Sequence, residues 1–326
     1  MLYDDRVKNE IRFYENVQNV HDLPEIFHYW SSRHLAPKCV SLDFSDPNNF
    51  YIQYIEQIAA QYPGRGCEIL SVGAGNCDTE VALAKLLLER NIQNFTFNCL
   101  DLNPHMLERG KQIVSENQLQ SYFDYLETDI NGWKVDQKYQ IIIANQSLHH
   151  FVELEVLFDK TYDALDDDGY FLSNDMIGRN GHMRWPEALE IILALWATLE
   201  DRHKWNHQLN QFEAQYENRD CSTEGFEGIR AQDILPLLIK KFKFHRFLAF
   251  SNLINVFVDR SFGPNFDVNN AEDCYFIDFV AKLDDYFIES GKIKPIQMIA
   301  AMTRHLSAPV RIYKHLSPEF CIRYST

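Results

Sequence analysis

The chain has 326 residues, of which 46% are hydrophobic and 24% are charged, as in an ordinary globular protein. Its 31 basic and 47 acidic residues give a formal net charge of −16, which argues against a nucleic-acid partner because phosphate contacts require Lys and Arg. The sequence has no apolar run long enough to cross a membrane, and its seven cysteines form no close pair, which argues against a membrane helix, a metal site and a disulfide framework.

Residues 1–66 precede the first expected strand and are rich in aromatic side chains. They begin without the basic start and apolar stretch of a secretory signal, so we expect a cytoplasmic protein. A helix is predicted over 21–30, with Asp22 as its cap and Pro24 in its first turn. We expect 1–66 to form an N-terminal helical cap that acts as a lid over a binding crevice, with simple core packing of its aromatic residues as the alternative.

A short apolar run over 68–77 ends at two glycines and is followed by a helical pattern. Its first residues suit a strand that is buried on both faces of a parallel sheet. Gly73 and Gly75 allow a tight turn and a close approach of the backbone to a ligand. Asp78 and Thr79 are candidate caps of the following helix. A strand, a glycine turn and a helix N-terminus together predict a binding crevice at the carboxyl end of a sheet.

From residue 67 to 175, strand and helix patterns alternate, which predicts an α/β fold with a parallel sheet covered on both faces. The expected strands lie at 69–72, 95–101, 123–126, 139–145 and 170–175. The expected helices lie at 78–88, 103–113 and 152–165.

Residues 176–240 interrupt this alternation with a strongly apolar helix at 186–200 and a long polar stretch. A segment of this length is too long for a simple crossover loop, so we expect a helical insertion after strand five. The apolar helix could pack within the protomer or against a second copy, which leaves a homodimer open.

Strand patterns return at 244–250 and 254–259, and we expect these two strands to form an antiparallel pair that closes the edge of the sheet. A helix is predicted over 273–290, and 261–326 is expected to be a C-terminal helical extension.

Ligand-type side chains follow several of the expected strands. Asp101 lies 28 residues beyond Gly73, where a carboxylate accepts hydrogen bonds from the ribose hydroxyls of a nucleoside cofactor. Asp129 can accept a hydrogen bond from an adenine amino group, and Ile130 offers an apolar contact to the ring. Asp78 takes the place of the third glycine in a dinucleotide motif, and its charge counts against NAD because it would repel a pyrophosphate.

The chain resembles the class I S-adenosylmethionine-dependent methyltransferases over roughly 67–260. The matching stretches are Ile-Leu-Ser-Val-Gly-Ala-Gly at 69–75, Cys-Leu-Asp-Leu-Asn-Pro at 99–104, Glu-Thr-Asp-Ile at 127–130 and Ala-Asn-Gln-Ser-Leu-His-His-Phe at 144–151. The resemblance implies a Rossmann-like sheet of seven strands with an antiparallel last hairpin, and S-adenosylmethionine as the cofactor. The family often has an acid where this chain has Ser71, and often a third glycine where it has Cys77.

By this resemblance, the glycine loop lines the methionine and ribose portion of the cofactor, the acid after strand two holds the ribose, the third loop holds the adenine, and the fourth borders the sulfonium. The implied cofactor-binding residues are Gly73, Ala74, Gly75, Asp101, Leu102, Asp129, Ile130, Asn145 and Gln146.

His149 and His150 follow strand four beside the expected methyl position, and they are the first candidates for a general base, which is needed only when the acceptor is protonated. Other aromatic and basic residues are expected to face the acceptor, namely Tyr14, Tyr29, Trp30, Arg179, His182 and Trp185. We expect methyl transfer to oxygen or nitrogen of a small molecule, with a natural product as the specific hypothesis. The alternatives are a protein or RNA methyltransferase, a non-catalytic cofactor-binding protein and a nicotinamide-dependent oxidoreductase.

Overall fold

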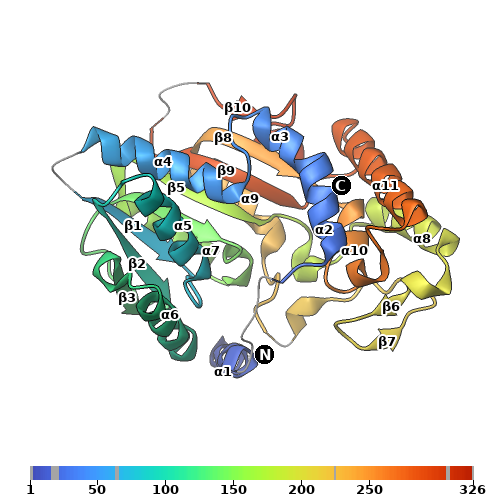
Figure 1. Cartoon of the computed structure of the whole chain (residues 1–326), viewed down its shortest axis with the longest axis horizontal. Helices are drawn as coiled ribbons and strands as arrows, with labels where there is room; N and C mark the ends of the chain where they lie inside the picture. Colours follow the sequence, from blue (N-terminus) through green and yellow to red (C-terminus); the bar gives the residue numbers. More distant parts are fainter. Residues whose placement is uncertain (1–2, 16–21, 63–65, 224, 306–308, 325–326) are drawn as a thin grey trace.

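The computed structural model describes residues 3–15, 22–62, 66–223, 225–305 and 309–324. Its centre is a sheet with the strand order β10-β8-β9-β5-β4-β1-β2-β3 (Figure 1). The strands are β1 (Cys67–Val72), β2 (Phe95–Asp101), β3 (Phe123–Glu127), β4 (Tyr139–Asn145), β5 (Leu165–Met176), β8 (Lys243–Phe250), β9 (Gln297–Thr303) and β10 (Arg311–Ile312). All neighbours pair in parallel except β9, which is antiparallel to both β5 and β8.

The five strands expected between residues 67 and 175 are confirmed. In β4, the residues from Tyr139 to Ala144 are all buried, and β1 is buried at all but its second residue. A strand without a polar face needs cover on both sides, which explains why these apolar runs sit in the middle of the sheet.

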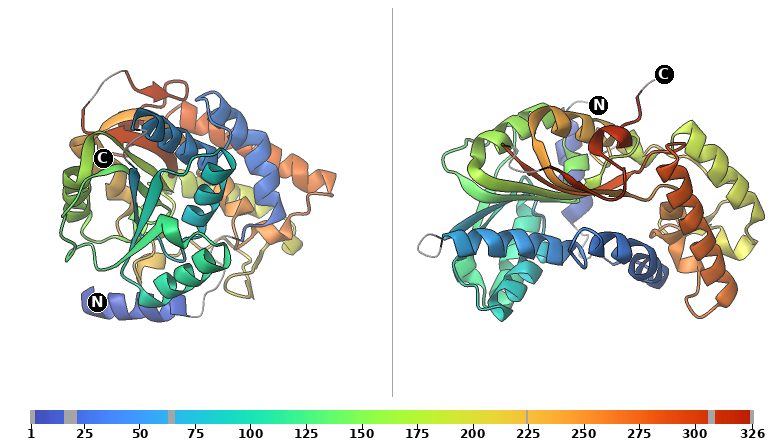
Figure 2. Two further views of the ribbon diagram at one scale, coloured as in Figure 1. Left: turned by 60° about the vertical axis from the view of Figure 1, so that its left-hand side comes forward. Right: turned by 90° about the horizontal axis from the view of Figure 1, so that it is seen from above.

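Helices supply that cover on both faces of the sheet (Figure 2). On one face lie α4 (Pro47–Gln61), α5 (Asp78–Glu89) and α6 (Pro104–Glu116), which pack against one another and against the strands. On the other face lie α7 (Leu154–Ala164) and α9 (Ala231–Lys241). Asn103 caps α6 by accepting hydrogen bonds from the backbone N–H groups of His105 and Met106, as the Asn-Pro start predicts.

An antiparallel strand pair toward this end of the sheet is confirmed. The prediction that 254–259 forms one of its strands was wrong. This segment is the helix α10 (Leu253–Val258), and all six of its residues are buried. Its β-branched residues favour a strand locally, but tertiary packing overrides that preference. The second strand of the hairpin is β9, so 297–303 belongs to the sheet and not to a helical extension. The sheet has eight strands rather than seven because β10 adds a short edge.

The insertion expected at 176–240 holds the short turn Asn180–His182, the helix α8 (Pro186–Thr198), a small hairpin of β6 (Trp205–Asn206) and β7 (Gln211–Phe212), and then α9. After β8, α11 (Ala271–Glu289) contacts α10. The short helix α12 (Pro318–Cys321) follows β10 and contacts α9.

The N-terminal segment is helical, as expected, but its helices are spread over two places. Helix α1 (Tyr3–Glu15) lies apart from α2 (Glu25–Trp30), α3 (Ala36–Val40) and α4, which follow one another along the other side of the molecule (Figure 1). Pro24, not Asp22, occupies the cap position of α2. Part of the helix predicted over 21–30 falls on residue 21, which lies outside the described residues.

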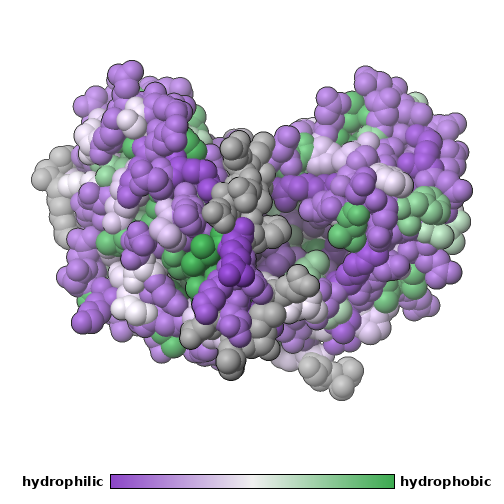
Figure 3. Space-filling model, turned by 90° about the horizontal axis from the view of Figure 1, so that it is seen from below, coloured by the Kyte–Doolittle hydropathy of each residue, from purple (hydrophilic) through white to green (hydrophobic). Residues whose placement is uncertain are grey.

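The molecular surface seen from below is largely hydrophilic and is hollowed between two lobes (Figure 3). Hydrophobic residues occur there in separate groups rather than as one continuous patch. Within the described part of the chain, no helix combines the length and the apolar character that a membrane span requires.

Candidate active site

The loop after β1 is built for a close approach of its backbone. Gly73 and Gly75 both have positive φ angles, of 70° and 55°. A Cβ at Gly73 would lie 2.7 Å from the Cβ of Ser147, and one at Gly75 would lie 3.0 Å from the Cε of Met106. Cys77, where the family often has a third glycine, also has a positive φ of 60°, so the backbone conformation persists without the glycine. This residue, not Asp78 or Thr79, is the N-cap of α5.

Asp101 lies at the end of β2 and faces this loop. Its Oδ2 accepts a hydrogen bond from the backbone N–H of Gly75 at 2.8 Å, and its Oδ1 accepts one from the N–H of Asn103 at 2.8 Å. Burial raises the pKa of Asp101, and these two N–H groups partly oppose that rise. Each carboxylate oxygen retains acceptor capacity for a ribose hydroxyl.

The departure from the family at Ser71 has a counterpart in the structure. The hydroxyl of Ser71 donates a hydrogen bond to Oε1 of Glu80 at 2.6 Å, and both side chains are buried. Helix α5 therefore brings a carboxylate to the strand position where the family often has an acid.

The loop after β3 holds the expected adenine residues. Asp129 accepts hydrogen bonds at 2.8 Å from the hydroxyl of Tyr3, which belongs to α1, and from the backbone N–H of Asn131. Ile130 is buried, and its carbonyl accepts a hydrogen bond from Nζ of Lys160 at 2.7 Å. Lys160 also donates to two further carbonyls of this loop, which fixes the loop's course.

Asn145 and Gln146 lie where β4 ends. The side-chain oxygen of Asn145 accepts a hydrogen bond from the Tyr51 hydroxyl at 3.1 Å, and its amide donates to Oγ1 of Thr79 at 3.0 Å. Asn145 thus ties α4 and α5 to the sheet. The backbone N–H of Gln146 donates to the carbonyl of Asn174 at 2.8 Å. That these two residues border the sulfonium of the cofactor stays a prediction.

His149 is the most strongly positioned of the expected catalytic residues. Its Nδ1 lies 2.7 Å from Oδ1 of Asp175, and both side chains are buried. The other carboxylate oxygen of Asp175 accepts hydrogen bonds from the backbone N–H groups of Ser147 at 2.8 Å and Leu148 at 2.7 Å. Asp175 is the last residue but one of β5 and His149 follows β4, so the parallel pairing of these strands brings the two together.

Three imidazoles meet around one carboxylate from the insertion, that of Glu227. Oε1 of Glu227 lies 2.5 Å from Nε2 of His182 and 3.6 Å from Nε2 of His149. Oε2 of Glu227 lies 3.4 Å from Nε2 of His150. The Glu227 side chain is 41% exposed, while those of His149, His182 and His150 are 6%, 19% and 22% exposed. These four residues are called the imidazole cluster below.

The charges in the imidazole cluster are strongly coupled. Burial disfavours the protonated form of His149, but Asp175 and Glu227 outweigh burial and raise the pKa of His149 to about 10. Burial also disfavours the charged form of Glu227, but hydrogen bonds from His149 and His182 hold the pKa of Glu227 well below its usual range. Burial lowers the pKa of His182, and the charge of His149 adds to that effect. At neutral pH the cluster therefore holds a charged His149, a charged Glu227 and a neutral His182.

Helix α1 covers the imidazole cluster and the cofactor loops together. Oε1 of Glu10 lies 2.9 Å from Nδ1 of His150. Arg6 donates hydrogen bonds to the carbonyl of Ser222, at 2.6 Å, and to that of Gly225 in the insertion. The ring of Tyr14 lies 6.3 Å from that of His150, as expected for a residue facing the site.

The other expected acceptor residues lie in different surroundings. Trp30 is buried and packs against Phe27 at 5.3 Å between ring centroids. Burial and the charge of Asp278 on α11 raise the pKa of Tyr29 to about 12, which places the Tyr29 hydroxyl next to α11. Arg179 stacks over the ring of Trp185 at 5.6 Å. Of the expected acceptor residues, His182 belongs to the imidazole cluster and Tyr14 lies beside it. The other four pack elsewhere, namely Tyr29, Trp30, Arg179 and Trp185.

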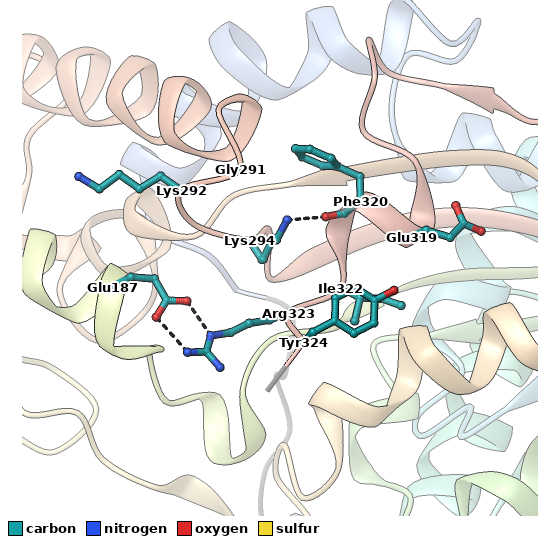
Figure 4. Close-up of a pocket in the computed structure, with 9 residues that line it drawn as sticks. All are labelled: Glu187, Gly291, Lys292, Lys294, Glu319, Phe320, Ile322, Arg323 and Tyr324. Carbon is teal, nitrogen blue, oxygen red and sulfur yellow. Dashed lines mark hydrogen bonds and ion pairs between the residues drawn. The ribbon is translucent and has the colours of Figure 1, made fainter. Parts of the chain in front are cut away.

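A concave region with a volume of about 530 Å³ lies at the C-terminal segment (Figure 4). Arg323 crosses this region, lies 4.6 Å from the centre of the Trp185 ring and pairs with Glu187 at 2.7 Å. Nζ of Lys294 donates a hydrogen bond to the carbonyl of Phe320 at 2.6 Å. These contacts anchor the C-terminal segment on α8, far along the chain from the cofactor loops.

Sequence reasoning missed Glu227, Glu10 and Asp175 as parts of the site. The sequence does indicate a site position for Asp175, because this residue lies at the carboxyl end of β5, the strand beside β4, and His149 follows β4. Glu10 and Glu227 lie on segments whose position over the site depends on tertiary packing, and nothing in their local sequence distinguishes them from other surface acids.

The residues of these loops suit S-adenosylmethionine. The loop from Gly73 to Gly75 leaves no room for Cβ atoms, the Asp101 carboxylate is fixed beside it by backbone N–H groups, and Asp129 with Ile130 offers the donor-accepting and apolar surfaces that an adenine needs. A family model described as a methyltransferase domain matches residues 70–171, which contain all of these positions. Residues 70–171 therefore hold a methyltransferase domain.

Solved structures that are similar to this chain share few of its residues. An S-adenosylmethionine-dependent methyltransferase from Thiobacillus denitrificans in complex with S-adenosyl-L-homocysteine is 11% identical, with a TM-score of 0.42, 87% of this chain covered and 100% of that one. The StiE O-MT is 10% identical, with a TM-score of 0.44 and coverages of 80% and 82%. The glycopeptide N-methyltransferase MtfA complexed with sinefungin is 12% identical, with a TM-score of 0.39 and coverages of 78% and 87%. None of the curated proteins matches the chain.

Proposed function

We propose that this chain is an S-adenosylmethionine-dependent methyltransferase that transfers a methyl group to an oxygen or nitrogen atom of a small molecule. The most specific form of the proposal is that this small molecule is a natural product. The observation that carries the proposal is the imidazole cluster, in which three histidines and Glu227 meet beside the loops proposed to hold the cofactor. A hydroxyl or ammonium acceptor must lose a proton on methylation, and such a cluster can take it.

The cofactor, when bound, supplies a methyl group that is already activated by its attachment to a sulfonium. Gly73, Gly75 and Asp101 would hold its ribose and methionine portion, and Asp129 with Ile130 would hold its adenine. The remaining task of the chain is to align the acceptor and to exclude water. The cover that α1 and the insertion place over the site suits both requirements.

The protonation states suggest distinct roles within the imidazole cluster. His182 is neutral at pH 7 because burial lowers its pKa, so it can accept a proton. His149 is already protonated, and its bond to Asp175 fixes the ring, so it acts as an orienting positive charge. His150 borders the same carboxylate, and we retain it with His149 among the proposed catalytic residues.

The size of the acceptor follows from what covers the site. Tyr3 of α1 reaches Asp129 on one side, and Arg6 reaches the insertion on the other, so α1 spans the crevice. A net charge of −16 disfavours a polyanionic acceptor such as RNA. Small neutral or cationic acceptors fit this enclosure better than a protein or an RNA does.

The test begins with calorimetric titration of the purified protein with S-adenosylmethionine, S-adenosylhomocysteine and NAD. The protein is then incubated with labelled S-adenosylmethionine and three acceptor pools: small phenols, alcohols and amines; total protein; and total RNA. We expect label in the small-molecule pool only. Label confined to the protein or RNA pool would contradict the proposed acceptor class, and cofactor binding without labelling of any pool would favour a non-catalytic binding protein.

A further inference from the structure

The imidazole cluster contains a set of atoms with the composition of a metal site. Nε2 of His149, Nε2 of His182 and a carboxylate oxygen of Glu227 all lie within 4.8 Å of one another. We propose that these three side chains bind a divalent transition-metal ion beside the methyl-transfer site. Binding of the ion depends on these residues alone, whereas its role in the reaction rests on the function proposed above.

The distances between the donor atoms suit this role. In a coordination shell with bonds of about 2.0–2.2 Å to nitrogen and oxygen, neighbouring ligand atoms stand roughly 3–3.5 Å apart. Nε2 of His149 and Oε1 of Glu227 are already 3.6 Å apart. Nε2 of His182 is 2.5 Å from the same oxygen, as in a hydrogen bond, so an ion would need these two atoms to separate by about 1 Å or less.

The residues behind His149 hold it as a metal ligand is usually held. A ligating imidazole commonly donates its second N–H to a carboxylate, which fixes the tautomer and the ring orientation. Asp175 accepts from Nδ1 of His149 at 2.7 Å, and Nε2, which has to release its proton when it binds an ion, faces Glu227 and His182. Asp175 is itself fixed by the backbone N–H groups of Ser147 and Leu148.

The ligand set also selects the class of ion. Two imidazoles and one carboxylate suit zinc, iron, cobalt or nickel, whereas magnesium and calcium prefer sites made of oxygen atoms alone. Three protein ligands leave at least one coordination position for water or an acceptor atom. Glu227, at 41% exposure, is the most accessible member of the set, so an ion can enter from its side.

An ion at this position gives the proposed reaction a second route to a deprotonated acceptor. A bound divalent ion lowers the pKa of a coordinated hydroxyl, as it does for water. The acceptor oxygen would then lose its proton to solvent water before methyl transfer, and His182 would serve as a ligand rather than as the proton acceptor.

The test uses the full chain after treatment with a chelator and dialysis into metal-free buffer. Titration with Zn²⁺ in the calorimeter should show one site per chain, and Co²⁺ should give visible absorption bands of a protein-bound ion. Glu227→Gln and His182→Ala should each weaken Zn²⁺ binding by at least about tenfold, and Asp175→Asn by about 10–100-fold. His305→Ala, an exposed histidine outside the cluster, should bind as the unaltered protein does.

Two results would overturn the metal proposal: an unaltered protein that takes up no Zn²⁺ or Co²⁺, or Glu227 and His182 variants that bind as tightly as the parent. Cys221→Ser is included because that exposed thiol is another ligand for soft ions, and loss of binding in this variant alone would move the site away from the cluster. Circular dichroism of each variant separates loss of a ligand from loss of the fold. Titration with S-adenosylhomocysteine in parallel distinguishes failure of the metal site from failure of the methyltransferase proposal.

Discussion

At the scale of single residues, Asp101 carries the strongest expectation about the cofactor. We expect Asp101→Ala to weaken binding of S-adenosylhomocysteine at least about 100-fold, because hydrogen bonds to a charged group contribute about 1.5–3 kcal/mol each and the ribose offers two donors. Calorimetric titration measures the change. The fold should persist, although Gly75 and Asn103 lose the partner of their N–H groups.

The matched control for this residue is Asp124→Ala, which removes an exposed carboxylate from the neighbouring strand β3. Its affinity for S-adenosylhomocysteine should equal that of the parent. A normal affinity in Asp101→Ala would show that the ribose is held elsewhere.

The histidines of the imidazole cluster should affect catalysis more than cofactor binding. We expect His182→Ala, which removes the proposed proton acceptor, to lower the rate of methyl transfer by about 100-fold or more, which is the usual contribution of an acid–base group. His149→Ala and His150→Ala should each also lower the rate, because they remove the positive charge that orients the site and an imidazole beside Glu227. The dissociation constant for S-adenosylhomocysteine should change by less than about threefold. Single-turnover assays on an identified acceptor measure the first quantity, and full turnover in His182→Ala would place proton transfer elsewhere or make it unnecessary.

At the scale of elements, Asp284 links α11 to the start of α10. Its two carboxylate oxygens accept hydrogen bonds at 2.9 Å from the backbone N–H groups of Asn252 and Leu253. Burial raises the pKa of Asp284 to about 6 despite these bonds. The folded protein therefore holds this proton more tightly than the unfolded chain, whose aspartates titrate near pH 4.

The stability contributed by the protonated Asp284 is present below about pH 4 and is lost as the pH rises through about 6. Over this range the unfolding free energy of the parent should fall relative to that of Asp284→Asn by roughly 3 kcal/mol, because the pKa difference is about two units. Urea unfolding at pH 4 and at pH 7 measures the difference between the two proteins. If that difference does not depend on pH, Asp284 is not the titrating group.

Helix α1 should act as a lid that slows exchange of the cofactor. Arg6→Ala removes two hydrogen bonds between α1 and the insertion, so the lid should open more often and S-adenosylhomocysteine should dissociate at least severalfold faster. Stopped-flow competition measures this rate. Lys8→Ala alters an exposed residue of the same helix and should leave the rate unchanged; equal rates in both variants would argue against a lid.

Prediction from sequence worked best where one local pattern determines the structure. Strands β1 and β4 are buried over nearly their whole length, and the turn at Gly73 has a backbone requirement that few residues meet. Prediction failed for α10, because its β-branched residues are buried by contacts with distant elements. It also missed Glu227, whose role depends on where the insertion folds back over the sheet.

At the scale of the whole molecule, charge sets the choice of partner. A surface with a net charge of −16 should repel nucleic acid, so we expect a dissociation constant weaker than about 10⁻⁴ M for a single-stranded RNA at physiological salt. Fluorescence polarisation with a labelled oligonucleotide tests this. Micromolar binding that weakens steeply with added salt would reveal a local basic groove and revive an RNA acceptor.

The position of β9 has a consequence for how the protein is made. This strand lies inside the sheet, paired with β5 on one side and β8 on the other, yet it is formed by residues 297–303. During synthesis, β5 and β8 leave the ribosome long before their shared neighbour. The nascent chain therefore exposes two unpaired strand edges until residues 297–303 have been made, and such edges invite aggregation. Chaperones that shield nascent chains should matter most to this protein between the synthesis of β8 and the synthesis of β9.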